Sequence, residues 1–497
     1  MNKITKLSAI CLVLLFASSC KKDYLETSSS TDVDNTLVFK TTTTSYTALD
    51  GMYRITYSHA PAVGYASGTL HSDFGQKAYD VVNDLMGNDM VVNLQGYGWF
   101  NRDYQYTERA QLTDNRRPFC IWTYYYTLIK NANNLIYYID GATGPATDKE
   151  NIKGQALAMR AFCYYNLINY FQQTYKGNET KPGVPLVLTP PYGDLPRGTV
   201  QQVYDQIIKD LNAAEPLLVG KTQDHKSHID IHVCQAIRAR VALTMENWAD
   251  AASYANKART GYTPMASTEY TKGFNSISNP EWMWGAEVIT DQATIYASFF
   301  SHMDAAAFDY AQLGGQKKIT KELYSKINSS DIRYKVFTKP TGSPNSAKFP
   351  DYCQTKFHLA SPSAWAGDYL FMRAAEMYLI EAEALARQGN DAAAKTTLET
   401  LIKTRYAGYS APTASPALLN EILLQRRIEL WGEGFSLFDI KRLKTGLNRP
   451  TGAGNHGSPN FDPKIYVLAP GDAQMIMKIP QKEIDVNSTF TAGDQNP

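Results

Sequence analysis

Residues 378–390, with the sequence YLIEAEALARQGN, carry the pattern that decides the fold. Small and apolar side chains recur here at steps of three and four residues, which places them on one face of a helix. The stripe consists of Ala375, Tyr378, Ala382 and Leu385. Gly389 and Asn390 then end the helix, and a second stripe follows at Ala394, Leu398 and Leu401. The segment therefore predicts two helices joined by a tight turn.

The same rhythm recurs along the chain and predicts further helix pairs. The predicted helices cover residues 117–140, 148–173, 199–218 and 236–247, a helix beginning at 248, and residues 419–444, with a break around Gly432 and Gly434. Helix–turn–helix pairs with small residues on their inner faces resemble tetratricopeptide repeats. Because these pairs are degenerate and interrupted, we do not expect a uniform solenoid.

Two long regions, residues 55–116 and 261–367, lack this periodicity and are rich in Gly, Asn, Asp and aromatic residues. Long irregular segments in a compact protein are usually functional. Strand patterns are few, at residues 184–188 and 475–479. The sequence therefore predicts a mainly α-helical protein with a large loop-rich part and few short strands.

The N-terminus predicts export. Basic residues precede an apolar run at residues 7–17, which is shorter than the ~20 residues needed to span a bilayer. We therefore expect a signal peptide at residues 1–19. The small residues before Cys20 resemble a lipoprotein processing site, which would make Cys20 the lipidation site; an ordinary signal peptide with an unmodified Cys20 is the alternative. Residues 20–36 are polar and are expected to form a flexible tether.

Composition excludes several classes of protein. The 497 residues exceed the ~250–300 at which a single core stops growing, so two domains or one elongated array are expected. The 49 basic and 48 acidic residues leave a formal charge of +1, which gives no electrostatic footprint for nucleic acid. The remaining cysteines lie far apart without metal-ligand spacing, and we expect free buried thiols. They are Cys120, Cys163, Cys234 and Cys353.

Several motifs, in this order, resemble those of one family. They are MRAFCYYNL at 159–167, GVPLV at 183–187, MRAAEMYL at 372–379, RRIELWGEGF at 426–435 and IP at 479–480. In these motifs the chain is similar to the SusD/RagB family of outer-membrane nutrient-binding lipoproteins. The resemblance implies a scaffold of four tetratricopeptide-like units beside a variable irregular half.

The resemblance also implies an organisation and a role. It implies one domain at 37–497, with the first repeat in 37–200, a second repeat and a ligand-binding insertion in 201–367, and further repeats with the family signature in 368–497. Such proteins are anchored by lipid to the outer membrane, face the cell exterior and deliver oligosaccharide to a SusC-like TonB-dependent transporter. Some members capture peptides instead, which is the alternative ligand class. The resemblance implies no catalytic residue and no cofactor, and it leaves bound Ca²⁺ open.

Residues 95–106, QGYGWFNRDYQY, have the composition expected of a sugar site. A sugar ring has an apolar face that packs on an aromatic ring, and hydroxyls that need amide, carboxylate or guanidinium partners. The resemblance also places ligand contacts in this stretch. The candidates are Tyr97, Trp99, Phe100, Asn101, Arg102 and Tyr104, with Trp99 as the first choice for a stacking platform; Trp99 and Phe100 in the core is the alternative.

A second candidate segment lies in the later irregular region. It contributes Phe300, His302 and Tyr310. Core packing is an equal alternative there, because Tyr296, Phe299 and Phe300 have helical spacing.

The sequence contains no GxSxG motif, no HExxH motif and no phosphate-binding loop. A surface hydrolase would need two carboxylates about 5–10 Å apart in a cleft. The signature charges are expected to form structural ion pairs. They are Arg426, Arg427, Glu429, Glu433, Asp439, Lys441 and Arg442. His225, His228 and His232 are close enough in sequence to suggest a metal site, but a solvated helix N-terminus is favoured.

Overall fold

The computed structural model describes residues 38–59, 70–113, 116–307, 309–339, 349–361, 363 and 365–497. The expected signal peptide, the lipidation at Cys20 and the tether to residue 36 lie outside the described residues. No helix in the described ranges is long and apolar enough to cross a membrane.

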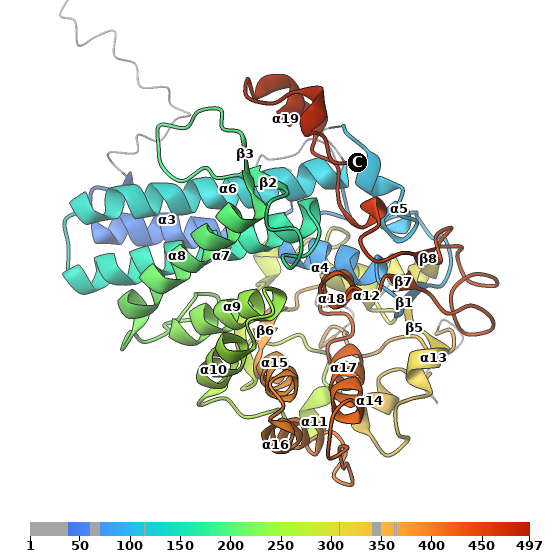
Figure 1. Ribbon diagram of the computed structural model, residues 1–497. Coiled ribbons are helices and arrows are strands. Elements are labelled where there is room, and N and C mark those ends of the chain that lie inside the picture. The colour runs from blue at the N-terminus through green and yellow to red at the C-terminus, as the bar shows by residue number, and fades with distance from the viewer. Residues whose placement is uncertain are drawn as a thin grey trace, which may run out of the picture.

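The scaffold consists of helices packed side by side with their neighbours in sequence (Figure 1). The first layer is formed by α3 (Thr42–Ile55), α6 (Arg117–Tyr138), α7 (Ala146–Phe171) and α8 (Val200–Leu218). The second is formed by α9 (Ile231–Thr244), α10 (Trp248–Arg259), α15 (Ala374–Arg387) and α16 (Asp391–Ile402), followed by α17 (Ala417–Glu429) and α18 (Ser436–Leu443). The prediction of a mainly helical repeat scaffold is confirmed.

Small residues allow the close helix contacts that the sequence predicted. A Cβ atom added to Gly154 on α7 would lie 2.8 Å from Cγ of Leu218 at the end of α8. The start of α8 is fixed by Thr199, whose side chain accepts a hydrogen bond from the backbone N–H of Gln202. Gly434, with φ of 91°, separates α17 from α18, and a Cβ atom there would meet that of Asp80 at 2.6 Å.

The strands are short and, in the described ranges, form four antiparallel two-stranded sheets. They pair β1 (Met90–Val92) with β5 (Lys317–Ile319), β2 (Pro182–Pro185) with β3 (Arg197–Thr199), β4 (Trp282–Ala286) with β6 (Tyr369–Arg373), and β7 (Leu447–Asn448) with β8 (Val467–Leu468). The strand predicted at 475–479 is wrong. That segment begins at the last residue of η8 (Ala473–Met475). The N–H groups of Met477 and Lys478 then bond to two unrelated segments, at Tyr170 O and Arg109 O, rather than to a strand.

The described residues also contain shorter helices, most of them in the two irregular regions. These are α4 (Gln76–Leu85), α5 (Asn101–Tyr104), η3 (Glu108–Ala110), η4 (Ile139–Gly141), α11 (Ser267–Tyr270), η5 (Thr290–Gln292), α12 (Phe299–Met303), η6 (Ala311–Gly315), α13 (Lys321–Tyr324), α14 (Ile332–Lys335), α19 (Gln481–Val486) and η9 (Ala492–Asp494). The β1–β5 pair joins the two irregular regions, and the pairing continues as Asn93 N–H bonds to Gln316 O and Leu94 N–H to Gly314 O, both at 2.9 Å. This contact brings the segment after residue 94 beside the segment before residue 316.

Helix α4 was not predicted, although Ala78, Val81, Val82 and Leu85 recur at helical spacing, because it is only ten residues long and lies within a region that is otherwise irregular. All of its residues are buried. One of its polar side chains holds the backbone of the C-terminal signature in place. The Asp84 carboxylate accepts backbone N–H bonds from Gly434, Phe435 and Ser436 at 3.0–3.1 Å, just before and at the start of α18. Burial raises the pKa of Asp84 to about 7, although these N–H groups favour the charged form.

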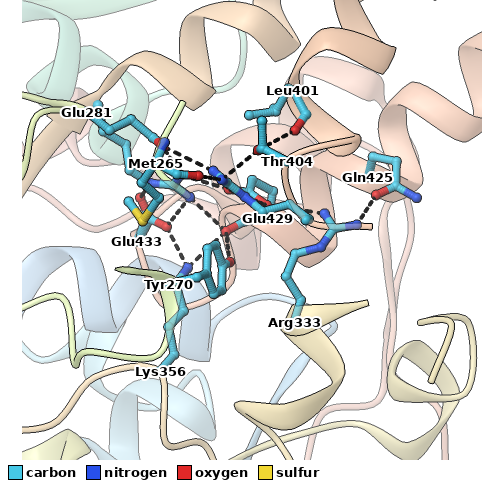
Figure 2. Close-up of polar contacts among 12 residues, drawn as sticks. Met265, Tyr270, Glu281, Arg333, Lys356, Leu401, Thr404, Gln425, Glu429 and Glu433 are labelled. Carbon is cyan, nitrogen blue, oxygen red and sulfur yellow. Dashed lines mark hydrogen bonds and ion pairs between the residues drawn. The ribbon is translucent and has the colours of Figure 1, made fainter. Parts of the chain in front are cut away.

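A buried ion cluster joins the later irregular region to the C-terminal repeats (Figure 2). Arg373 at the end of β6 contacts Glu281, Glu429 and Glu433 at 2.7–2.8 Å. Arg333 and Lys356 reach the same glutamates from separate segments (Figure 2). Burial alone would raise the pKa of Glu433, but Arg373 and Lys356 outweigh it and lower the pKa to about 2.

The other signature charges are also engaged within the structure. Arg426 and Arg442 share Asp439 at 2.7 and 2.6 Å, and Arg427 contacts Asp89 at 2.6 Å. Lys441 donates to main-chain carbonyls of Asn169 and Gln172. The prediction of structural ion pairs is confirmed for Arg426, Arg427, Glu429, Glu433, Asp439 and Arg442 but not for Lys441, which has no carboxylate partner among the described residues. The prediction of free buried thiols at the four cysteines is confirmed.

Candidate functional site

Five rings from both irregular regions meet at the surface. We call them the aromatic cluster: His71, Tyr97, Trp99, Tyr296 and Tyr310. Ring centroids of neighbouring members lie 5.3–6.1 Å apart. Tyr97 is 71% exposed and Tyr296 48%, so the cluster presents apolar ring surface to solvent.

The loop that carries Tyr97 and Trp99 is held by its own backbone. Gly98 and Phe100 both have positive φ, of 85° and 65°, which reverses the chain between the two aromatic residues and α5. Asn101 donates a side-chain hydrogen bond to Gln95 O at 2.8 Å and closes this turn. The Phe100 ring packs inward, with its centroid 4.9 Å from that of His302.

The structure separates the predicted site residues into two groups. Tyr97 and Arg102 are exposed, and Trp99 and Tyr310 are partly exposed, so these four can touch a ligand. The other candidates are buried to between 0% and 6% exposure and lie beneath the surface: Phe100, Asn101, Tyr104, Phe300 and His302. They support the cluster because each fills the interior with a ring or closes a turn, and sequence alone does not show on which side of the loop a ring falls.

His302 and Tyr104 show how the buried group acts. The ring of His302 stacks under Tyr310 at 5.1 Å, and its Nε2 bonds to the carbonyl of His71 at 2.8 Å. Burial lowers the pKa of His302 well below its usual value, so the ring is neutral at pH 7. Tyr104 bonds to Nδ1 of His456 at 2.6 Å and is fully enclosed.

His71 was missed by sequence reasoning, and Tyr296 was assigned to a helical stripe. His71 Nδ1 bonds to the hydroxyl of Tyr310 at 2.5 Å, and its ring stacks on Tyr296 at an angle of 12°. Burial, followed by the charge of His59, lowers the pKa of His71. Neither residue lies in a motif, and only the pairing of the two irregular regions brings them together.

A cleft of about 230 Å³ opens beside the aromatic cluster. Tyr97 and Trp99 line one part of it, and Arg102 and Arg116 line another. Its interior includes the buried pair Asp103–Arg117, joined by two bonds of 3.1 Å. A cleft with ring faces and guanidinium groups at its edge has the donors and the apolar surface that a sugar needs.

A larger cavity of about 390 Å³ lies elsewhere, between α17, α18 and the segment around β1. Its polar lining consists largely of groups already engaged in structure, such as Asp84, Asp89 and Asp439. The smaller cleft is the better candidate because it adjoins exposed rings.

The histidines near residue 228 do not assemble a metal site. His225 contacts Glu287 at 3.2 Å and His228 contacts Asp50 at 3.0 Å. Since α9 begins at Ile231, His228 precedes the helix and does not share a helix face with His232. Within the described residues, no group of three His, Cys, Asp or Glu side chains could hold a metal ion.

Family comparisons agree with this architecture. Residues 222–497 match the model of the SusD family, which is more than half of the chain. The chain belongs to the SusD family. Residues 23–243 match a second SusD-like model, described as starch-binding and associating with the outer membrane.

Individual SusD relatives cover nearly the whole chain. SusD-like protein P2 from Formosa agariphila is 24% identical over 480 residues, which cover 87% of this chain and 90% of the relative. A SusD-like carbohydrate-binding protein from Bacteroides vulgatus has a TM-score of 0.79 at 27% identity and covers 92% of this chain and 99% of its own. Surface glycan-binding protein A from Bacteroides thetaiotaomicron, in complex with laminarihexaose, has a TM-score of 0.68 at 16% identity, with coverage of 91% and 98%, and supports the fold alone.

Proposed function

We propose that this SusD-family protein captures oligosaccharide at the aromatic cluster and the adjoining cleft. The observation that carries the proposal is the exposure of Tyr97, Trp99, Tyr296 and Tyr310 at one place, beside guanidinium groups. Sugar rings stack on such faces while their hydroxyls bond to polar neighbours. The site uses ring surface and hydrogen-bond donors, and we assign the protein a binding role rather than an enzymatic one.

The proposal extends to the place and the partner of the protein. Family membership and the description of the N-terminal family model support an outer-membrane location. Cys20 would carry the lipid anchor, and residues 37–497 would form one domain that faces the cell exterior. The domain would pass its ligand to a SusC-like TonB-dependent transporter.

Two experiments test these statements. Binding of the purified protein to an array of oligosaccharides and peptides should show sugar ligands, and isothermal titration should then give their affinities. Binding of peptides alone would overturn the ligand assignment. Affinity purification from native outer membranes should recover a TonB-dependent transporter with the protein, and recovery of the protein without one would contradict the partner assignment.

A further inference from the structure

The cleft beside the aromatic cluster carries an unbalanced positive charge. Five charged side chains line it: Arg102, Asp103, Glu108, Arg116 and Arg117. Arg117 and Asp103 neutralise each other through two hydrogen bonds of 3.1 Å, and Arg117 also donates to Ser72 O at 2.8 Å. This pair therefore offers no free charge to a ligand.

The other two arginines share a single carboxylate. Glu108 lies 3.9 Å from Arg102 and 3.7 Å from Arg116, so both are contacts between charges that are too long for a hydrogen bond. The Glu108 carboxylate instead accepts the backbone N–H of Arg117 at 3.4 Å. Two guanidinium groups thus face one carboxylate, and the side chains that line the cleft carry a net formal charge of one positive unit.

Both guanidinium groups are open to solvent. The Arg102 side chain is 52% exposed and that of Arg116 is 37% exposed. In the described part of the chain, neither guanidinium donates a hydrogen bond, although each has several N–H groups. Their N–H groups can therefore bind an incoming acceptor without breaking an existing bond.

The placement of these groups relates charge to ring stacking. Tyr97 and Trp99 line the same cleft as Arg102 and Arg116. Its volume of about 230 Å³ is below the ~300–1,000 Å³ of pockets that enclose drug-sized ligands, which suits a single sugar unit with its substituent. Hydrogen bonds from guanidinium to an anionic oxygen are about twice as strong as neutral ones.

We propose that the cleft selects an acidic sugar, whose ring packs on Tyr97 or Trp99 while its anionic oxygens bind Arg102 and Arg116. This inference rests on the proposed function and adds the class of sugar. A uronate carboxylate and a sulfate ester present the same chemistry of exposed anionic oxygens, and both fit the guanidinium geometry. Neutral glycans satisfy the aromatic rings but leave the charge unused.

The test uses matched pairs of oligosaccharides with the purified protein. Oligogalacturonates are compared with their carboxyl-reduced counterparts, and sulfated galactan oligosaccharides with their desulfated counterparts, by isothermal titration at two salt concentrations. We expect at least one acidic member to bind tenfold or more tightly than its neutral counterpart, with a preference that weakens as salt is raised. The pair that shows the preference identifies the substituent as carboxylate or sulfate.

Variants assign the preference to the two arginines. R102Q/R116Q should lose tenfold or more of the affinity for the acidic ligand and much less of the affinity for the neutral counterpart, so that the preference between the two falls. R102K/R116K should retain part of the preference. E108Q removes the shared carboxylate and should tighten acidic binding severalfold. The control K176Q/K335Q, which removes two exposed charges outside the cleft, should bind as the wild type does.

Equal affinity for acidic and neutral members, or no effect of R102Q/R116Q, would overturn the inference and leave the proposed glycan binding intact. Absence of binding to every oligosaccharide would overturn both.

Discussion

The hydroxyl oxygen of Tyr310 lies 2.5 Å from Nδ1 of His71, across 239 positions of sequence. The same tyrosine ring neighbours Tyr97, Trp99 and Tyr296 at 5.3–6.1 Å. Tyr310 is therefore the point at which two irregular regions become one surface, and the first predictions concern this surface.

Replacement of Trp99 by Ala should weaken glycan binding about tenfold, equivalent to about 1.4 kcal/mol, because it removes a ring from the stacking surface. Isothermal titration measures the change. Tyr137→Ala is the matched control, since Tyr137 is an aromatic residue, 54% exposed, on α6 and outside the cluster. Unchanged affinity in Trp99→Ala would remove Trp99 from the site.

Tyr310→Phe keeps the ring but removes the hydroxyl that holds His71. A hydrogen bond of this kind contributes about 0.5–1.5 kcal/mol, so we expect affinity to fall severalfold while the melting temperature changes little. Tyr192→Phe is the control, because it removes a hydroxyl that bonds to Asn134, and neither residue belongs to the aromatic cluster. A loss of affinity equal in both variants would show that the hydroxyl of Tyr310 has no special role.

Glu433→Gln should destabilise the protein strongly, because Arg373 and Lys356 would remain buried without the carboxylate that they share. Breaking a buried pair costs about 3–5 kcal/mol. Glu269→Gln, which breaks an exposed pair with Lys272, should cost less than about 1 kcal/mol. Urea unfolding measures both, and similar values for the two variants would contradict a special role for the buried cluster.

Acid should destabilise the protein through His456. Burial, with Arg449 nearby, lowers the pKa of this imidazole from 6.5 to about 3. Between these values the unfolded chain binds the extra proton, so the free energy of unfolding falls as pH drops, by up to about 1.4 kcal/mol per pH unit. His456→Gln removes this titration, and its plot of unfolding free energy against pH should be shallower from 6.5 to 3 whatever its absolute stability. Parallel plots for the variant and the wild type would refute the assignment.

The helices were predictable because their stripes are local. Ala375, Tyr378 and Ala382 lie on one face whatever the rest of the chain does, and Gly389 and Thr199 mark boundaries through their own backbone and side-chain chemistry. Helix α4 was missed although Ala78, Val81, Val82 and Leu85 form a local stripe, because ten residues give only one repeat of the period and the region around them is irregular.

The site was predictable only in part. Tyr97, Trp99 and Arg102 could be chosen from composition, because they occur in a loop with no stripe to join. The division between Trp99 outside and Phe100 inside depends on the positive φ of Phe100 and on the contact with His302. The place of His71 in the cluster depends on the pairing of β1 with β5, which joins two regions far apart in the sequence.

The buried ion cluster also bears on how the ligand specificity of such a protein can change during evolution. The charges that hold the scaffold together around Arg373 are buried and paired. Arg102 and Arg116 at the cleft are instead exposed and are not buried in an ion pair. Mutations at positions such as 97, 102 and 116 can therefore accumulate and be selected for new nutrients while the helices stay in place. One scaffold can in this way acquire different ligand specificities during evolution.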